Sequence, residues 1–280
     1  MGISRQAYYQ GRAREQQREV RAAHILDWVR ARRLRQPRLG TRKLHHLMQT
    51  AATSPRGGRD ALFDLLRTAR LLVPTRRAYH KTTHSHHRFR RHPNLLKAGP
   101  AQVRAEGSEQ VWVADITYLP LQAGTAYVSL LTDAYSRKIV GHHVHDSLHT
   151  VQVSQALKQA VNRRAGHWPV VHHSDRGIQY CATEYQSIHQ RHGLVCSMTD
   201  GDDCYQNALA ERINGILKNE LLLHKPADLD QAKRMVREAV DIYNHERPHL
   251  SLQLKTPDEV HRASLAEQLR RHSTVNQVST

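Results

Sequence analysis

Two kinds of apolar pattern alternate along the second half of the chain. Short runs rich in Val, Ile, Tyr and Thr predict strands, and longer segments with apolar residues every three or four positions predict helices. The expected strands are residues 110–121, 125–134, 137–145, 170–174 and 194–198. The expected helices are residues 150–163, 182–192 and 228–245, with one more starting near residue 206. Three hairpin-connected strands followed by alternating helices and strands predict an α/β fold with a mixed sheet and helices on its faces.

The apolar pattern of the first 75 residues predicts helices instead. They are expected at residues 19–34, 41–50 and 59–72. Thr41 is expected to cap the second helix, and Arg42 and Lys43 follow it on the outward face. Three helices with basic outer faces fit a helix-turn-helix DNA-binding region. A plain three-helix bundle would give the same pattern, so the sequence leaves both interpretations open.

Charge divides the chain sharply. The net charge is +17, and residues 1–100 hold 23 Lys and Arg against 5 Asp and Glu, which leaves the rest of the chain at −1. A basic segment ahead of a neutral one predicts contact with a polyanion, most simply DNA, although a solvated basic arm would have the same composition. Residues 76–108 lack sustained periodicity and are predicted to be a basic linker. Its Arg88, Arg90 and Arg91 could follow a phosphate backbone.

Several function classes are disfavoured by composition. The three cysteines form no C-x-x-C pair, which favours a reducing compartment and argues against a zinc finger. The histidines His84, His86 and His87 have no matching ligand pair and are interpreted as part of the basic surface. No apolar run approaches the length of a membrane span, and the N-terminus lacks the apolar segment of a signal peptide. These features predict a cytoplasmic protein.

Three carboxylates are candidates for chemistry. Asp115 lies inside the strand-like run VWVADITYLPL, Asp175 ends an apolar run in HHSDRGIQY, and Glu211 lies on the polar side of a predicted helix. A carboxylate inside an apolar strand needs a partner or a metal, because burying it unpaired is costly. A strand, a strand end and a helix could bring the three acids together on a divalent metal. Spacing alone does not distinguish this from three acids with separate structural roles.

The motifs around these acids carry a resemblance to a known family. They are WVADITYL, TDAYSRKIVG at 132–141, HSDRGIQY, CYQNALAERINGILKNEL, and YNHERPHLSLQLKTPDEV at 243–260. In this order, and with 35 residues between Asp175 and Glu211, they resemble the DDE transposases of bacterial insertion sequences, specifically the protein of the second reading frame of a two-frame element. The likeness covers roughly residues 2–262.

The resemblance implies an organisation for the whole chain. The core at residues 109–262 would be ribonuclease H-like and related to retroviral integrases. It would follow a small all-α helix-turn-helix region at 1–75 and the linker at 76–108, and precede a loosely ordered tail at 263–280. The implied partners are duplex DNA at the element ends and the target, further copies of this chain on DNA, and an upstream first-frame product.

The resemblance also implies the chemistry. Asp115, Asp175 and Glu211 would hold Mg²⁺ or Mn²⁺, expected as two ions, and would catalyse cleavage of the element ends and strand transfer by phosphodiester transesterification. Lys218 and Asn207 would contact DNA, with a solvated lysine and a helix cap as the structural alternatives. Asp133 also ends a strand but lies outside the matching motif, so it is left out of the site.

Two other functions compete with this one. The first is a hydrolytic nuclease on the same core without strand transfer, and the second is a DNA-binding regulator with a degenerate core. The three intact acids argue against the regulator. Joined DNA products, as opposed to nicks alone, would separate the transposase from the nuclease.

Overall fold

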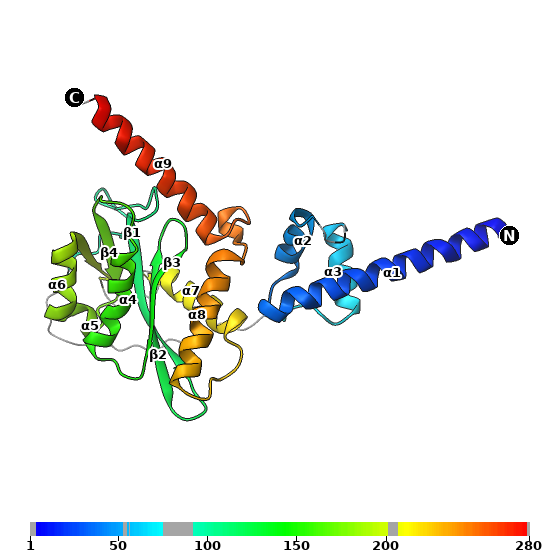
Figure 1. Ribbon diagram of the computed structural model, residues 1–280, viewed down its shortest axis with the longest axis horizontal. Coiled ribbons are helices and arrows are strands. Elements are labelled where there is room, and N and C mark those ends of the chain that lie inside the picture. The colour runs from blue at the N-terminus through cyan, green and yellow to red at the C-terminus, as the bar shows by residue number, and fades with distance from the viewer. Residues whose placement is uncertain (1–3, 53–54, 56, 75–91, 201–206, 279–280) are drawn as a thin grey trace. The chain divides into compact units, whose positions relative to one another are not determined.

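The computed structural model describes residues 4–52, 55, 57–74, 92–200 and 207–278, with side chains up to Arg271. The chain forms two compact units, Met1–Tyr79 and His80–Thr280. Within the described residues the first unit is all helical, and the second is built on a five-stranded sheet (Figure 1).

The described part of the first unit contains three helices. They are α1 (Arg5–Arg35), α2 (Thr41–Thr50) and α3 (Arg59–Thr68). Side chains from all three helices and the α1–α2 turn share one core, made by Ile25, Val29, Leu39, Leu44, Met48, Leu62 and Leu66. The apolar stripes of the sequence therefore locate all three helices correctly, because those stripes are the faces that pack together.

The ends of these helices differ from the prediction. α1 begins at Arg5 and not at residue 19, because Ser4 caps it by accepting a hydrogen bond from Ala7 N at 3.2 Å. Its first half is rich in Ala, Gln, Glu and Arg, which favour helix without any apolar stripe to reveal it. Gly40 occupies the N-cap position of α2, and the predicted cap Thr41 is the first helical residue. α3 ends at Thr68, before Arg70 turns the chain with a φ of 55°.

The second unit is built on a mixed sheet in the order β3-β2-β1-β4-β5. The strands are β1 (Val111–Pro120), β2 (Thr125–Asp133), β3 (Ile139–His145), β4 (Val170–Ser174) and β5 (Leu194–Met198). β1, β2 and β3 form antiparallel hairpins, whereas β4 runs parallel to both β1 and β5. The predicted strands and the mixed sheet are confirmed.

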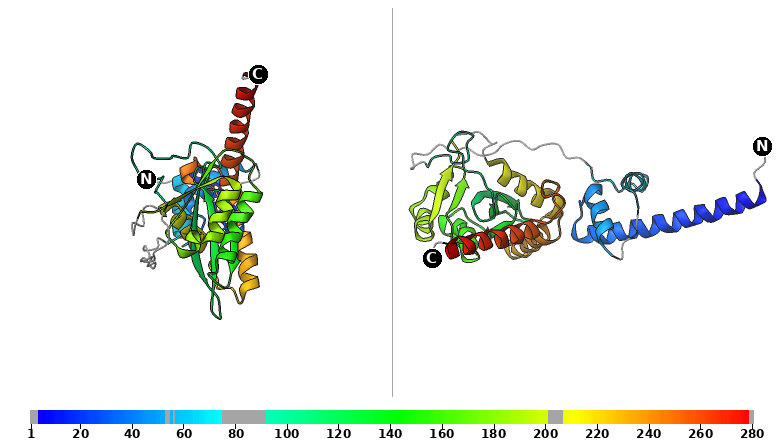
Figure 2. Two further views of the ribbon diagram at one scale, coloured as in Figure 1. Left: turned by 90° about the vertical axis from the view of Figure 1, so that its left-hand side faces the viewer. Right: turned by 90° about the horizontal axis from the view of Figure 1, so that it is seen from above.

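Helices cover both faces of this sheet (Figures 1 and 2). One face carries α4 (Thr150–Asn162), α5 (Ile178–Cys181) and α6 (Thr183–His192). The other face carries α7 (Ala208–Ile216), the π-helical turn η2 (Leu217–Leu221) and α8 (Leu229–His245). α4 approaches β3 so closely that a Cβ on Gly141 would lie 2.1 Å from Ala156 O.

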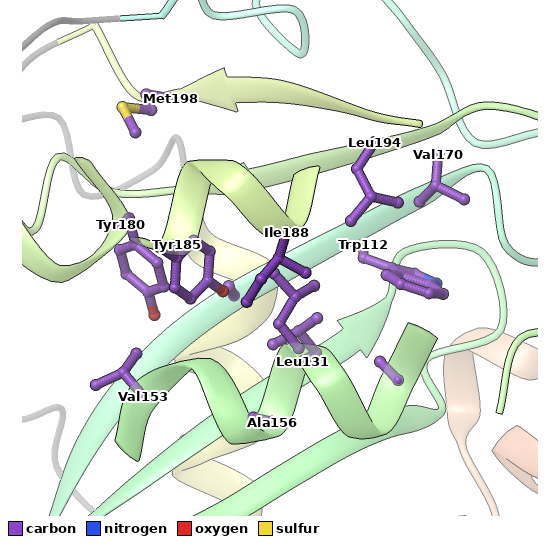
Figure 3. Close-up of a cluster of buried hydrophobic side chains, with 13 residues drawn as sticks. Trp112, Leu131, Val153, Ala156, Val170, Tyr180, Tyr185, Ile188, Leu194 and Met198 are labelled. Atoms are coloured by element: carbon purple, nitrogen blue, oxygen red, sulfur yellow. The ribbon is translucent and has the colours of Figure 1, made fainter. Parts of the chain in front are cut away.

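The direction of the β1 side chains decides where the acids can meet. Trp112 and Ala114 belong to the core on the α4 face, which Figure 3 shows with Ile188 and Tyr185 of α6 packed against the sheet. Side chains alternate along a strand, so Asp115 points to the opposite face, where α7 crosses. The core on the α4 face thus leaves Asp115 on the side of the Glu211 helix.

The tail expected to be loosely ordered from residue 263 is helical, which corrects that prediction. After the 3₁₀ turn η3 (Leu250–Leu252), α9 (Pro257–Val278) continues through it. Ser264 Oγ accepts from Ser108 N at 2.9 Å, and the side chains of Gln268 and Gln110 are joined by a 3.0 Å hydrogen bond. These polar contacts anchor the helix near the start of β1, and such contacts create no apolar periodicity that a sequence could display.

Part of the segment predicted to be a linker is hydrogen-bonded to the sheet. Residues 75–91, among them Arg88, Arg90 and Arg91, lie outside the described part of the chain. Residues 93–95 lie beside β5: Met198 N donates to Pro93 O at 3.2 Å, and Leu95 N donates to Ser197 Oγ at 3.0 Å. This segment is therefore attached to the edge of the sheet.

Candidate active site

The register of the sheet brings Asp115 and Asp175 together. Val113 pairs with His173 in the parallel β1–β4 ladder, and each acid lies two residues further along its chain. Two residues along a strand return the side chain to the same face, so both acids project from one face at the same edge. Gly177 N donates to Asp175 Oδ1 at 2.9 Å and fixes the turn that follows β4.

α7 crosses β1 with Glu211 between two asparagines. Asn207 Nδ2 donates to Ala114 O at 3.1 Å, and Asn214 Nδ2 donates to Asp115 Oδ2 at 2.6 Å. Residues 207, 211 and 214 follow one another at helical spacings of four and three, so they share a face. The two hydrogen bonds hold that face against the strand, and Glu211 lies on the same face of the helix.

The negative charges of Asp175 and Glu211 both act on Asp115. Burial and the neighbouring negative charge of Asp175, with a smaller contribution from Glu211, raise the pKa of Asp115 to about 7. Hydrogen bonds from Ile116 N and Asn214 oppose this rise. Acids from a strand, a strand end and a helix therefore share one electrostatic environment.

The residues present fit a divalent cation, although they are not drawn tightly together. Among the residues that the structure describes, no three His, Cys, Asp or Glu side chains are gathered closely enough to hold one ion. Carboxylates that repel one another gain from a cation between them, and oxygen donors are the ligands that Mg²⁺ and Mn²⁺ prefer. The amide oxygens of Asn207 and Asn214 are buried and have no hydrogen-bond partner within the described part of the chain. The site thus offers two amide oxygens without a hydrogen-bond partner in the described part of the chain, on the same helix as Glu211.

Lys218 contributes a positive charge to the same region. It is partly buried in η2; burial lowers its pKa, and the negative charge of Asp115 opposes this effect. The charge of Asp115 acts on Lys218, so the lysine lies near this acid. A cation there suits a phosphate, and the implied DNA contact of Lys218 stays a prediction.

The other predicted site residues lie in different surroundings. Asn207 is 7% exposed and bonded to β1, which favours an anchoring role; its DNA contact stays a prediction. Arg42 is exposed on α2 and Lys43 is partly exposed. The histidines at 84, 86 and 87 lie outside the described residues, as do Arg88, Arg90 and Arg91.

The carboxylate of Asp133, which was left out of the predicted site, holds neighbouring segments of the fold together. It is fully buried and accepts hydrogen bonds from Glu109 N, Ser136 N and Ser136 Oγ, each at 2.7 Å. His261 of α9 contacts Ser136 Oγ at 2.9 Å through Nδ1. This network joins the end of β2 to the start of β1 and to α9.

Glu109 belongs to the same network. Its carboxylate accepts hydrogen bonds from Ala165 N and Gly166 N, and lies 3.8 Å from His261 Nε2. Burial alone would raise the pKa of Glu109, but the interactions with His261 and these backbone amides lower it below its ordinary value. The buried carboxylate is therefore held in its charged form.

Asn214 is the site residue that sequence reasoning missed. Its position three residues after Glu211 places it on the same helical face, and this spacing is the signal that could have revealed it. A polar residue on a helix does not by itself indicate a functional site, and only the fold shows that Asp115 lies opposite Asn214.

Comparisons with known proteins decide the family. Family models for the integrase core domain match residues 105–204 and 192–257. The uncharacterized 31 kDa protein of insertion element IS600 from Shigella sonnei is 35% identical over 263 residues, which cover 90% of this chain and 92% of that protein. The chain belongs to the insertion-sequence transposases of bacteria. The transposase of insertion element IS629 from Shigella sonnei is 36% identical over 169 residues, 59% of this transposase and 56% of its relative.

Solved structures include similar folds. The integrase catalytic core of HTLV-2, in complex with magnesium, is matched with a TM-score of 0.46 and 19% identity over 56% of this transposase and 99% of that core. The match to the integrase core models, together with the strand order β3-β2-β1-β4-β5, shows the ribonuclease H-like fold that the resemblance implied. No helix in the described parts of this transposase has the length and apolar character to cross a bilayer.

Proposed function

We propose that this transposase cuts DNA at the ends of its element and joins the freed 3′-hydroxyl to target DNA. In the joining step the hydroxyl oxygen forms a bond to a target phosphorus while the existing bond from that phosphorus to a 3′-oxygen breaks. One phosphodiester thus replaces another, and the proton of the attacking hydroxyl is passed to the released one through solvent. The observation that carries the proposal is geometric: Asp115 and Asp175 each follow a paired position of the parallel β1–β4 ladder by two residues, and Asn214 of the Glu211 helix donates to Asp115 Oδ2 at 2.6 Å.

Asp115, Asp175 and Glu211 would hold Mg²⁺ or Mn²⁺, expected as two ions. Bound there, such ions would make a water or hydroxyl nucleophilic and would stabilise the leaving oxygen. The chain's own residues prepare the site. Ile116 N donates to Asp115 Oδ1 at 2.9 Å and Asn214 holds Oδ2, so the orientation of this carboxylate is set before any ligand arrives.

DNA binding would be divided among several parts of the chain. Lys218 is proposed to contact a phosphate near the acids, and Asn207 to hold α7 while reaching the DNA only at its exposed edge. The helical unit is proposed as a helix-turn-helix region, with Arg42 and Lys43 of α2 on its DNA-facing side. Arg88, Arg90 and Arg91 are proposed to contact the phosphate backbone of the DNA.

The proposed reaction also implies partners and a location. Two element ends must be held near one target, so further copies of this chain are expected to assemble on DNA. An upstream first-frame product is a further proposed partner. We propose that the reaction takes place in the cytoplasm, at the nucleoid, because the proposed substrate is bacterial DNA.

The test is incubation of the purified chain with labelled duplexes carrying candidate element ends and with Mg²⁺. Cleaved ends together with joined strands are expected, and chelator should abolish both. Nicks without joined strands would instead support the nuclease. Full activity in chelator would contradict metal-dependent chemistry at the three acids, and the variant Asp115→Asn separates that outcome from a contaminating enzyme.

A further inference from the structure

The N-terminal half of α1 contributes no residue to the hydrophobic core of its unit. Every residue from 5 to 21 is exposed, whereas Ile25 and Val29 further along the same helix are buried. Figures 1 and 2 show this half extending past α2 and α3. A helix of these 17 residues is about 25 Å long at 1.5 Å per residue, which is a large part of one turn of duplex DNA.

The side of α1 that is buried in its second half carries arginines in its first half. Arg14, Arg18 and Arg21 precede Ile25 and Val29 at spacings of four, three, four and four residues, so all five lie on one side of the helix. Arg14 and Arg18 have no ion-pair partner among the described residues. The exposed half therefore presents a line of positive charge; this arginine stripe is defined as Arg14, Arg18 and Arg21.

The arginine stripe destabilises this part of the helix when nothing packs against it. Like charges four residues apart repel, and a short helix without tertiary contacts is marginal in water. Gly11 weakens it further, and no atom lies within 4 Å of a Cβ placed there, so packing does not require a glycine. A polyanion laid along the stripe would remove the repulsion and stabilise the helix.

We propose that residues 5–21 of α1 form an arm that lies along duplex DNA, with the arginine stripe contacting phosphates. Residues 5–21 hold five arginines and two glutamates, a net charge of +3, which complements DNA and opposes pairing with a second copy of the same helix. This proposal rests on the proposed function, since it assigns a DNA contact outside α2, α3 and the catalytic core.

The test measures duplex binding by the full chain in chelator, so that no chemistry is required. Fluorescence anisotropy with a labelled duplex of random sequence is recorded over a series of KCl concentrations. The variant Arg14→Gln/Arg18→Gln/Arg21→Gln should flatten the slope of log affinity against log salt by about 2 to 3, because each lost phosphate contact removes roughly 0.9. Replacing the same three residues by Lys should preserve the slope.

A matched control removes three charges from the opposite side of the same helix. Arg5→Gln/Arg12→Gln/Arg30→Gln changes the net charge equally, and its residues lie about half a turn from the stripe. This control variant should retain most of the wild-type slope of log affinity against log salt. Equal slopes in the two glutamine variants would overturn the proposal, as would a stripe variant that binds like the wild type.

Two further readouts keep the outcomes distinct. Sedimentation without DNA should give the same mass for the wild type and the stripe variant; loss of a dimer together with an unchanged slope would make a second copy the occupant and overturn the proposal. Cleavage of element ends by the wild type is measured separately. If the stripe variant has the flatter salt slope but the wild type does not cleave element ends, the proposed function is wrong and the proposed DNA contact of α1 is kept. If the wild type cleaves but the slope of the stripe variant is unchanged, only the proposed DNA contact of α1 is wrong.

Discussion

The hydrogen bond from Asn214 to Asp115 makes the sharpest prediction about the site. The substitution Asn214→Ala removes a donor 2.6 Å from a carboxylate that two other acids already repel. A hydrogen bond to a charged group contributes about 1.5–3 kcal/mol. If that orientation is needed for the reaction, its loss should slow cleavage by roughly 10- to 150-fold, since each 1.36 kcal/mol is a factor of ten.

The assay is single-turnover cleavage of an element end over a Mg²⁺ titration. Asn214→Ala should also raise the Mg²⁺ concentration needed for half-maximal rate, because a partner that orients a metal ligand typically changes metal affinity by about 10- to 100-fold. Asn214→Asp should be slower still, because it replaces the donor by a fourth negative charge. High Mn²⁺ should rescue the alanine variant in part.

The matched control is Asn162→Ala, the same change on the exposed last residue of α4. It should leave both the rate and the Mg²⁺ dependence unchanged. Thermal unfolding separates a positioning effect from loss of the fold. If Asn214→Ala cleaves within twofold of the wild type at every Mg²⁺ concentration, the hydrogen bond has no role in positioning Asp115.

Three more predictions follow from the same structure. Asp115→Asn, Asp175→Asn and Glu211→Gln should each abolish cleavage and joining in gel assays while DNA binding persists, and combining them should add nothing further; activity in one variant would remove that residue from the site. Lys218→Ala should impair joining at limiting DNA without changing the melting temperature, and unchanged kinetics would make it a solvated lysine. Because the pKa of Glu109 is lowered in the fold, its stabilisation is present above the unfolded pKa and lost as the pH falls through the folded one. Denaturant titrations from neutral to acid pH should therefore show a smaller loss of unfolding free energy for Glu109→Gln, and parallel curves would refute the assignment.

The sequence by itself determined the elements and the acids. Strands β1 to β5 and helices α4, α6 and α8 end within a few residues of their predicted limits. Each helix buries one side, which requires a period near 3.6 in its apolar residues, and strands such as β2 and β4, which are buried on both faces, are short apolar runs. Asp115, Asp175 and Glu211 could be proposed from motif and order, because an acid within an apolar segment conflicts with its surroundings.

Only the tertiary structure decided which polar groups meet. Asn214 lies 99 positions from Asp115, and Ser264 lies 156 positions from Ser108, and such pairs leave no periodic signal along the chain. The parallel register between β1 and β4 sets Asp115 beside Asp175, which spacing could not show. The exposed start of α1 was missed for the opposite reason: a helix that buries nothing needs no apolar stripe, so its arginines could be recognised as one surface only after the helix was seen to continue past its core.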